Sequence, residues 1–233
     1  MNTLLLSELQ SEEKDLLQTL VLLEEYIFQL NQTESSTTSG EQSFDSLETI
    51  IEQCQAVIDE IDSPLEQAEI LLNELFYQHL FIDEHKVNWP VSSFKVASSL
   101  NQRLMSPIVK AAFVCEIVNA SGFNADLVFV PSKVMVRINC DEKYAIIFDA
   151  VTGESLNWHE LDLRLDDLDG DPSQHELMDM NRQAILVEYL STLKSALIRE
   201  QLFDKALLTV DLLLSLNPDD PLQRRDRGFL LHQ

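Results

Sequence analysis

The chain has 233 residues, of which 45% are hydrophobic, and a formal net charge of −24 at pH 7. This length is enough for one or two domains with a hydrophobic core. So acidic a chain repels nucleic-acid phosphates and anionic membranes. Its apolar runs are shorter than the ~20 residues that cross a bilayer. Its N-terminus lacks the features of a signal peptide. We therefore expect a soluble, cytoplasmic protein that binds neither nucleic acid nor membrane.

The first segment, residues 1–63, is predicted to be acidic and helical. Apolar residues recur at helical spacing over residues 3–30 and again over residues 44–61. Between them, residues 31–43 form a polar, low-complexity stretch that we interpret as a linker. The negative charge of the chain is concentrated in this first segment and in residues 158–180, which we interpret as an acidic connection.

Three helices are predicted in the middle of the chain. Ser63 can cap a helix over residues 65–80, and a second helix is expected over residues 92–103. Pro107 suits the first turn of a third helix over residues 108–120. This third helix is apolar on most sides, which predicts a central and buried position.

The apolar period then changes from that of a helix to that of a strand. Residues 126–131, 134–138 and 143–148 are rich in β-branched and aromatic side chains and are separated by turn signals, which predicts three antiparallel strands. Residues 181–233 return to helix. The predicted fold class is α+β, with a helix-rich N-terminal half, a small antiparallel sheet and a C-terminal helical hairpin.

Several short motifs accompany these elements. They are Arg103-Leu-Met-Ser-Pro107, Phe129-Val-Pro-Ser-Lys-Val-Met-Val-Arg137, Phe148-Asp-Ala-Val-Thr-Gly-Glu154, and Leu216-Asn-Pro-Asp-Asp-Pro221 with Arg225-Asp-Arg-Gly228. Together with the order of a buried helix and three strands, they resemble the bacterial SirB-type family from about Leu65 to the C-terminus. The resemblance implies a transglutaminase-like, papain-like core over residues 64–157, and helices like those of tetratricopeptide (TPR) repeats over residues 181–233.

The same resemblance assigns the positions of a catalytic triad. A transglutaminase-like enzyme uses a cysteine at the start of the central helix, a histidine on a strand, and an aspartate that orients the histidine. In this sequence those positions fall on Pro107, Lys133 and Asp149. Proline cannot act as a nucleophile, and lysine lacks the two ring nitrogens of an imidazole. We therefore predict a degenerate site and no enzyme, with Lys133 close to Asp149.

Other side chains offer no better nucleophile. A shift of one position would place Ser106 where the cysteine is expected, but the histidine would still be missing. Cys115 lies inside an apolar helix, and Cys140 lies beside two acidic residues that raise a thiol pKa. The chain has 3 cysteines, including Cys54, and this odd, small number favours reduced structural thiols over disulfides.

Metal and cofactor sites are not predicted. His79 and His85 are separated by a spacing that matches no common metal motif. Asp167, Asp169 and Asp171 alternate as in a calcium loop, but this chain has proline where that loop needs glycine and methionine where it needs glutamate. A glycine-rich phosphate loop is also missing from the sequence.

The C-terminal segment fits the TPR pattern in part. With Ala206 at a small-residue position, Pro218 falls near the end of the repeat, Pro221 opens the next helix, and Gly228 takes a small position in it. Lys194 replaces the small residue expected in the first helix. One repeat cannot bury its own apolar faces, so this hairpin must pack on the core or on a partner.

Three arginines, Arg224, Arg225 and Arg227, crowd the end of this acidic chain. Guanidinium groups pair well with carboxylates. The cluster either fastens the last helix to acidic segments of the same chain, or binds an acidic partner peptide or a second copy of the chain. Both interpretations stay open at this point.

Three functional hypotheses follow. The leading one is a non-catalytic interaction or regulatory protein whose helices bind a protein partner. One alternative is a residual thiol or serine hydrolase or transferase, against which the missing cysteine and histidine argue. The second alternative is an acidic mimic that binds a basic partner, against which the balanced charge of residues 181–233 argues. The sequence does not identify the partner, and self-association is compatible with it.

Overall fold

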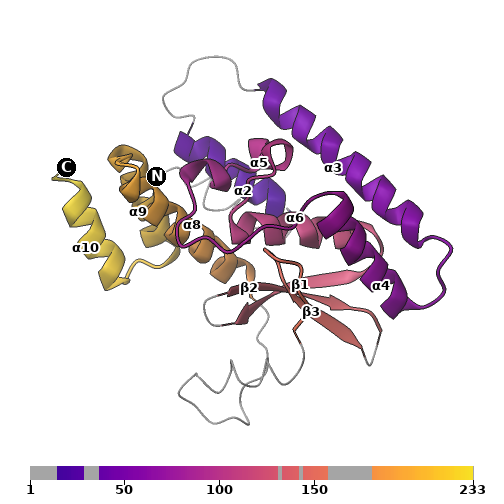
Figure 1. Cartoon of the computed structure of the whole chain (residues 1–233). Coiled ribbons are helices and arrows are strands. Elements are labelled where there is room, and N and C mark those ends of the chain that lie inside the picture. Colours follow the sequence, from indigo (N-terminus) through magenta and orange to yellow (C-terminus); the bar gives the residue numbers. More distant parts are fainter. Residues whose placement is uncertain (1–14, 29–36, 131–132, 142–143, 157–179, 233) are drawn as a thin grey trace, which may run out of the picture.

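The computed structural model describes residues 15–28, 37–130, 133–141, 144–156 and 180–232. A small antiparallel sheet lies against a group of helices, and three further helices lie at the C-terminal end of the chain (Figure 1). The predicted α+β fold class is confirmed. No helix within these described ranges is both long enough and apolar enough to cross a membrane.

The first described helix, α2 (Leu16–Phe28), is amphipathic as predicted. Its buried apolar residues recur at helical spacing and share one side of the helix. They are Leu17, Leu20, Leu23 and Ile27. The part of the predicted helix that precedes residue 15 lies outside the described residues.

Helix α3 (Thr37–Ile58) is longer than predicted. It begins inside the predicted linker, so residues 37–43 are helical, and the prediction of a linker that continues to residue 43 is wrong. Residues 31–36 of that linker lie outside the described residues. Once the apolar part of α3 is helical, each further residue adds one backbone hydrogen bond, so polar residues extend the helix at little cost.

Helix α4 (Pro64–Asn73) begins where the sequence predicts. The Ser63 side chain accepts a hydrogen bond from the Glu66 amide, and Pro64 lies in the first turn. A π-helical turn, η1 (Glu74–Gln78), continues the helix. Leu80 follows with a left-handed backbone (φ 57°), and this residue turns the chain into a loop that leads to residue 90.

The helix predicted over residues 92–103 consists of two elements, so the prediction of one continuous helix is wrong. The 3₁₀ turn η2 (Val91–Phe94) and helix α5 (Val96–Gln102) are separated by Lys95, whose backbone is extended (φ −84°, ψ 102°). Phe94 and Val96 are both buried. Residues two positions apart point to different sides of a helix, so the break at Lys95 allows both side chains to enter the core.

Helix α6 (Pro107–Ala120) is the central helix. Ten of its 14 residues are buried, so it must be surrounded on most sides. It packs against β1 and β2 of the sheet and also contacts α2, α3 and α8. The predicted start at Pro107 and the predicted burial both agree with the structure.

The sheet consists of β1 (Asn124–Val130), β2 (Lys133–Asn139) and β3 (Ala145–Asp149), antiparallel and in that order. Side chains alternate between its two faces, as the pleat of a strand requires. Some strand residues belong to the main core, which also contains α6. They are Leu127, Val136, Ile138 and Phe148. Residues of a smaller cluster are Val128, Met135 and Ile147, with Leu156 packed against them.

Each edge of the sheet receives a further backbone hydrogen bond from outside the strands. On the β3 edge, the Leu156 amide donates to the Ile147 carbonyl over 2.8 Å. On the β1 edge, the Met180 amide donates to the Leu127 carbonyl over 2.9 Å. The segments that follow β3 and precede α8 are therefore attached to opposite edges of the sheet.

A tight turn follows β3. The Gly153 amide donates to the Asp149 carbonyl over 2.8 Å, and Gly153 has a φ of 75°. The ring of Phe76 lies directly against this glycine, because a Cβ atom added there would be 2.6 Å from two ring carbons. Phe76 in turn packs edge-to-face on Phe148, with ring centroids 5.8 Å apart.

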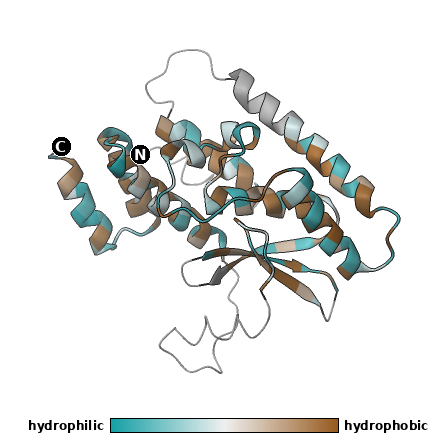
Figure 2. Ribbon diagram, viewed as in Figure 1, coloured by the Kyte–Doolittle hydropathy of each residue, from teal (hydrophilic) through white to brown (hydrophobic). Residues whose placement is uncertain are grey.

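Helices α8 (Arg182–Arg199), α9 (Phe203–Leu216) and α10 (Pro221–Leu230) form the C-terminal part, with α10 outermost (Figure 1). Tyr189 joins α8 to the rest of the protein, because its buried hydroxyl donates to the Phe94 carbonyl over 2.9 Å. Figure 2 shows that α10 is mainly hydrophilic, whereas hydrophobic and hydrophilic residues are interspersed along the coloured part of α3.

Lys194 fastens α10 to α8. Its ammonium lies 2.9 Å from Gln223 Oε1 and 2.7 Å from Asp226 Oδ2, and its side chain is only 11% exposed. This is the position at which the TPR pattern has a small residue. The lysine therefore replaces close helix packing by a partly buried ion pair between the two helices.

Candidate functional site

Lys133 and Asp149 are neighbours because of the strand register. Met135 of β2 pairs directly with Asp149 of β3, and Lys133 precedes Met135 by two residues on the same side of the strand. Such diagonal neighbours lie ~7–8 Å apart, within reach of a long side chain. Lys133 Nζ lies 2.6 Å from Asp149 Oδ2. The structure thus brings these two predicted residues together.

A histidine from a loop adds a third member. His85 lies between η1 and η2, and its Nε2 lies 2.7 Å from the same oxygen, Asp149 Oδ2. The Asp83 amide donates to the Val151 carbonyl over 3.0 Å, which holds this loop beside the turn after β3. The expectation that the site would lack an imidazole is therefore wrong, although the imidazole does not come from position 133. We call His85, Lys133 and Asp149 the Asp149 cluster.

Asp149 is almost completely buried, with 1% of its surface exposed. Its Oδ1 accepts a hydrogen bond from the Val151 amide over 2.9 Å, so both carboxylate oxygens have donors. Burial alone would raise the pKa of this carboxyl, but the hydrogen bonds from Lys133, His85 and the Val151 amide outweigh burial and hold the pKa below its usual value. Asp149 is therefore ionised at neutral pH, and the Lys133 ammonium balances its charge.

Lys110 of α6 is a buried cation close to this cluster. Its ammonium donates to the carbonyls of Phe81 over 2.8 Å and Val151 over 3.5 Å. Burial lowers the pKa of Lys110 to about 8, against the opposing attraction of Asp83 and Asp149. Both carbonyls belong to segments that flank the Asp149 cluster, so Lys110 holds these segments against α6.

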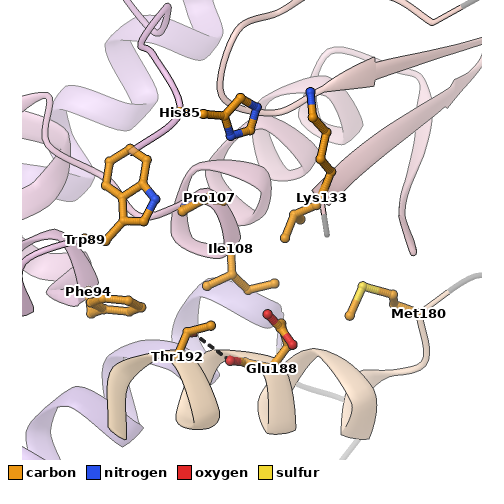
Figure 3. A pocket seen from close by; sticks show the side chains of 10 residues that line it. His85, Trp89, Phe94, Pro107, Ile108, Lys133, Met180, Glu188 and Thr192 are labelled. Atoms are coloured by element: carbon orange, nitrogen blue, oxygen red, sulfur yellow. Dashed lines mark hydrogen bonds between the residues drawn. The ribbon is translucent and has the colours of Figure 1, made fainter. Parts of the chain in front are cut away.

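The Asp149 cluster borders a cavity of about 220 Å³ between the sheet, α6 and α8. In Figure 3, His85 and Lys133 lie at one end of this cavity, and Glu188 and Thr192 of α8 lie at the other. The remaining lining residues are largely apolar. They are Trp89, Phe94, Pro107, Ile108, Val134 and Met180. Pro107 therefore faces the same cavity as Lys133, at the start of α6.

The cysteines do not line this cavity. Cys54 and Cys115 are buried in the core, and burial raises the pKa of both thiols, that of Cys54 to about 12. Burial and the neighbouring Asp141 also raise the pKa of Cys140, which is partly exposed elsewhere on the molecule. A raised pKa leaves little thiolate at neutral pH, so all three thiols are poor nucleophiles.

The hydroxyl groups near the cavity are not available either. Ser106 is fully buried and is not among the described residues that line the cavity. Thr192 does line the cavity, but its hydroxyl donates to the Glu188 carbonyl over 2.7 Å within its own helix. The described cavity lining therefore contains no thiol and no free hydroxyl group that could act as a nucleophile.

The C-terminal arginines lie away from this cavity and pair with carboxylates near them. Arg224 pairs with an aspartate of the turn before α10, and Arg225 pairs with the adjacent Asp226. These two side chains are 60% and 72% exposed. Arg227 Nε lies 2.7 Å from Asp211 Oδ1 of α9, so Arg227 alone of the three links two helices.

The remaining candidates for metal ligands are His79 and the alternating aspartates. The alternating carboxylates Asp167, Asp169 and Asp171 lie outside the described residues. His79 lies 3.7 Å from Glu74 rather than beside Asp149, and burial lowers its pKa.

Sequence reasoning missed His85 and Glu188 as site residues. His85 is an isolated histidine on a polar loop, and a loop position gives no periodic signal of burial. Glu188 precedes the buried Tyr189 in α8, which places it at the border of the apolar face of that helix. An acidic residue at such a border is the one signal in the sequence that could have identified it.

The sequence of this chain matches two groups of known proteins. Residues 41–191 match the transglutaminase-like superfamily, and residues 193–233 match the tetratricopeptide repeat. The chain therefore belongs to the transglutaminase-like superfamily, with a TPR-type segment at its C-terminal end.

More particularly, the chain is similar to protein SirB1 of Salmonella typhimurium, with 27% identity over 193 residues that cover 82% of this chain and 72% of SirB1. It is also similar to the UPF0162 protein YchA of Escherichia coli K12, with 26% identity over 194 residues that cover 82% of this chain and 72% of YchA. The resemblance to the SirB-type family is thus confirmed. No solved structure matches the chain significantly.

Proposed function

We propose that this chain is a non-catalytic member of the transglutaminase-like superfamily that binds a protein partner. The observation that carries the proposal is the position of Pro107, which begins α6 in the same cavity as Lys133 and close to the Asp149 cluster. In the family pattern the attacking thiol belongs at this point. A proline side chain has no group that can attack a carbonyl carbon.

The chemistry of the remaining side chains supports the same proposal. The thiols are buried or have raised pKa values, and none of them lines the cavity. Acyl transfer by the mechanism of this superfamily needs a thiol within hydrogen-bond reach of its base, and the described lining contains neither a thiol nor a free hydroxyl group. The Asp149 cluster then contributes an ion-pair network that holds a loop on the sheet.

Partner binding is supported by the C-terminal segment. TPR helices commonly form surfaces that bind other proteins. Helix α10 exposes Leu222 and Phe229, which are 56% and 57% exposed, beside the exposed Arg224 and Arg225. Large apolar side chains next to arginines are enriched at protein interfaces.

One observation favours a hydrolytic alternative. His85 Nε2 is paired with a buried carboxylate, and the side chain is 39% exposed, an arrangement that suits a general base. Such a histidine could act as a general base without a protein nucleophile. The expected product would be that of direct hydrolysis, with no covalent intermediate on the protein.

An activity assay combined with affinity capture tests the proposal. The purified chain is incubated with peptide, ester and amine acyl-acceptor substrates, and immobilised chain is used to capture partners from a native lysate for mass spectrometry. We expect no turnover above that of a His85→Ala control, together with a stoichiometric protein partner. Turnover that is lost in His85→Ala would instead establish the hydrolytic alternative.

A further inference from the structure

Within the part of the chain that the structure describes, Glu188 is a carboxylate in the cavity without a partner. Among the described residues it forms no ion pair, and its side chain accepts no hydrogen bond. Burial raises the pKa of Glu188, and no charge of a described neighbour opposes this effect. A partly buried carboxylate in an apolar lining costs free energy unless a cation or a donor joins it.

The cations at the other end of the cavity do not compensate Glu188. Lys133 and His85 both bind Asp149, and Figure 3 shows the Lys133 side chain extended towards His85 rather than towards α8. Lys133 and Asp149 cancel each other in charge. Glu188 is therefore the one acidic side chain of the described lining, and neither cation at the opposite end pairs with it.

The shape and the walls of the cavity restrict what can bind beside Glu188. Its volume of about 220 Å³ is below the ~300–1,000 Å³ that is typical of sites for drug-sized ligands, so one long side chain suits it better than a cofactor. Trp89 and Phe94 provide aromatic surface. The Trp89 ring already attracts one cation, since Lys86 Nζ lies 4.5 Å from its centroid.

We propose that this cavity binds an arginine side chain of a basic partner protein, with the guanidinium on Glu188 and its methylene groups along the apolar wall. This inference rests on the proposed function and names the chemistry of the partner. A guanidinium is less strongly hydrated than an ammonium, stacks on aromatic rings and pairs with a carboxylate through two hydrogen bonds. It therefore fits an apolar, aromatic cavity that contains one carboxylate better than a lysine does.

The charge of the whole chain favours the same kind of partner. A net charge of −24 attracts basic segments over distances well beyond direct contact, and it raises their rate of encounter. Steering by this field lacks specificity. A cavity that selects one arginine would supply the specificity.

The test uses the full chain labelled with ¹⁵N and three capped tripeptides, acetyl-Gly-X-Gly-amide, in which X is arginine, citrulline or lysine. Citrulline has nearly the shape of arginine without its charge. The Trp89 indole N–H and the amides of α8 report binding in an NMR titration at fixed ionic strength. Glu188→Gln removes the charge from the cavity, and Glu25→Gln removes the same charge from an exposed position on α2 as the matched control.

We expect the arginine peptide to shift the signals of the cavity and the citrulline peptide to bind at least about tenfold more weakly, as expected for the loss of a hydrogen bond between charged groups. Glu188→Gln should weaken the binding of the arginine peptide by a similar factor. Glu25→Gln should leave the affinity for this peptide within about twofold of that of the native chain. The lysine peptide should bind more weakly than the arginine peptide.

Equal binding of the arginine and citrulline peptides would overturn the inference, and this comparison needs no variant. The inference would also be overturned if Glu188→Gln and Glu25→Gln lost equal affinity for the arginine peptide. The same holds if the lysine peptide bound as tightly as the arginine peptide. If the arginine peptide leaves the cavity signals unchanged while the chain still captures a partner without turnover, the arginine site fails and the proposed function stands.

Discussion

His85 and Asp149 are 64 positions apart in the sequence, yet His85 Nε2 lies 2.7 Å from Asp149 Oδ2. Lys133 binds the same oxygen from the neighbouring strand. Asp149 therefore connects a loop, a strand and, through the Val151 amide, the turn after β3. The carboxylate at the aspartate position of the family pattern is thus the centre of a hydrogen-bonded ion-pair network that includes a histidine.

The first prediction concerns Asp149→Asn. At neutral pH this substitution should lower the free energy of unfolding by about 1–3 kcal/mol, since a buried, hydrogen-bonded charge is lost and Lys133 loses its partner. Urea unfolding measures the effect. Asp59→Asn, which changes an exposed carboxylate, serves as the control and should alter stability by less than about 0.5 kcal/mol.

The pH dependence of this difference has a definite sign. The pKa of folded Asp149 is below the usual value of 3.8, so the unfolded chain binds a proton first as the pH falls. The stabilisation by Asp149 is complete above pH 3.8 and is lost as the pH falls through the folded pKa. The stabilities of the native chain and Asp149→Asn should therefore converge in acid. A difference in unfolding free energy that stays constant from pH 7 to pH 3 would contradict a lowered pKa for Asp149.

The second prediction concerns Lys110. Because burial lowers its pKa from 10.5 to about 8, the unfolded chain binds one more proton than the folded chain between these two values. The contribution of Lys110 to stability should therefore rise with pH across this window and stay constant below pH 8. Urea unfolding of the native chain and of Lys110→Met from pH 7 to pH 10.5 isolates this contribution. A flat difference between the two proteins would show that Lys110 titrates normally.

The third prediction concerns the turn after β3. Gly153→Ala should destabilise the fold by about 1–3 kcal/mol, because the residue has a positive φ and its new Cβ would collide with the Phe76 ring. Phe76 cannot move easily, since it is buried against Phe148. Thermal unfolding monitored by circular dichroism measures the change.

Two other glycines separate the causes of this effect. Gly122 also has a positive φ but open space around it, so Gly122→Ala should show the backbone strain alone, about 1–2 kcal/mol. Gly228 lies in α10 with open space around it, and Gly228→Ala should stabilise the helix by about 0.5–1 kcal/mol. If Gly153→Ala costs no more than Gly122→Ala, the contact with Phe76 is not rigid.

The fourth prediction concerns the thiols. In the native chain, a thiol reagent such as DTNB should react with Cys140 first, while Cys54 and Cys115 should react only on unfolding, since both are buried. Cys115→Ser and Cys140→Ser should remove no acyl-transfer or hydrolytic activity. An activity that disappears in either variant without loss of the fold would refute the non-catalytic proposal.

The fifth prediction concerns the C-terminal arginines. Arg224→Glu/Arg225→Glu should leave the melting temperature nearly unchanged, because both pairs are exposed and exposed pairs contribute only ~0–1 kcal/mol. The same double variant should reduce the capture of a partner or the self-association of the chain. Arg227→Glu is the matched comparison, and it should lower the melting temperature because Arg227 links α10 to α9. A double variant that loses stability but not association would assign the cluster to an internal clamp.

The predictable parts of this fold are those that depend on local patterns. The start of α4 at Ser63 and Pro64, the burial of α6 and the three antiparallel strands follow from caps and apolar periods. The register of β2 and β3 then places Lys133 beside Asp149. The break at Lys95 was not predictable, because only the tertiary core requires both of its neighbours to be buried.

The site was predictable only where strands determine it. His85 reaches Asp149 because contacts distant in sequence, such as that of the Asp83 amide with Val151, fix the path of its loop. Glu188 enters the cavity because α8 packs across the start of α6. Neither contact leaves a periodic pattern in the sequence, so neither residue could be assigned before the chain was folded.

The hydrogen bonds at the two edges of the sheet have a consequence for aggregation. A three-stranded sheet exposes unpaired backbone groups along both outer strands, and such edges readily add a strand from another molecule. Here the Leu156 amide occupies the Ile147 carbonyl on one edge, and the Met180 amide occupies the Leu127 carbonyl on the other. A foreign strand would have to displace these bonds before it could extend either edge. Polymerisation through the sheet is thereby hindered at both edges, even though the described residues add no further strand to protect it.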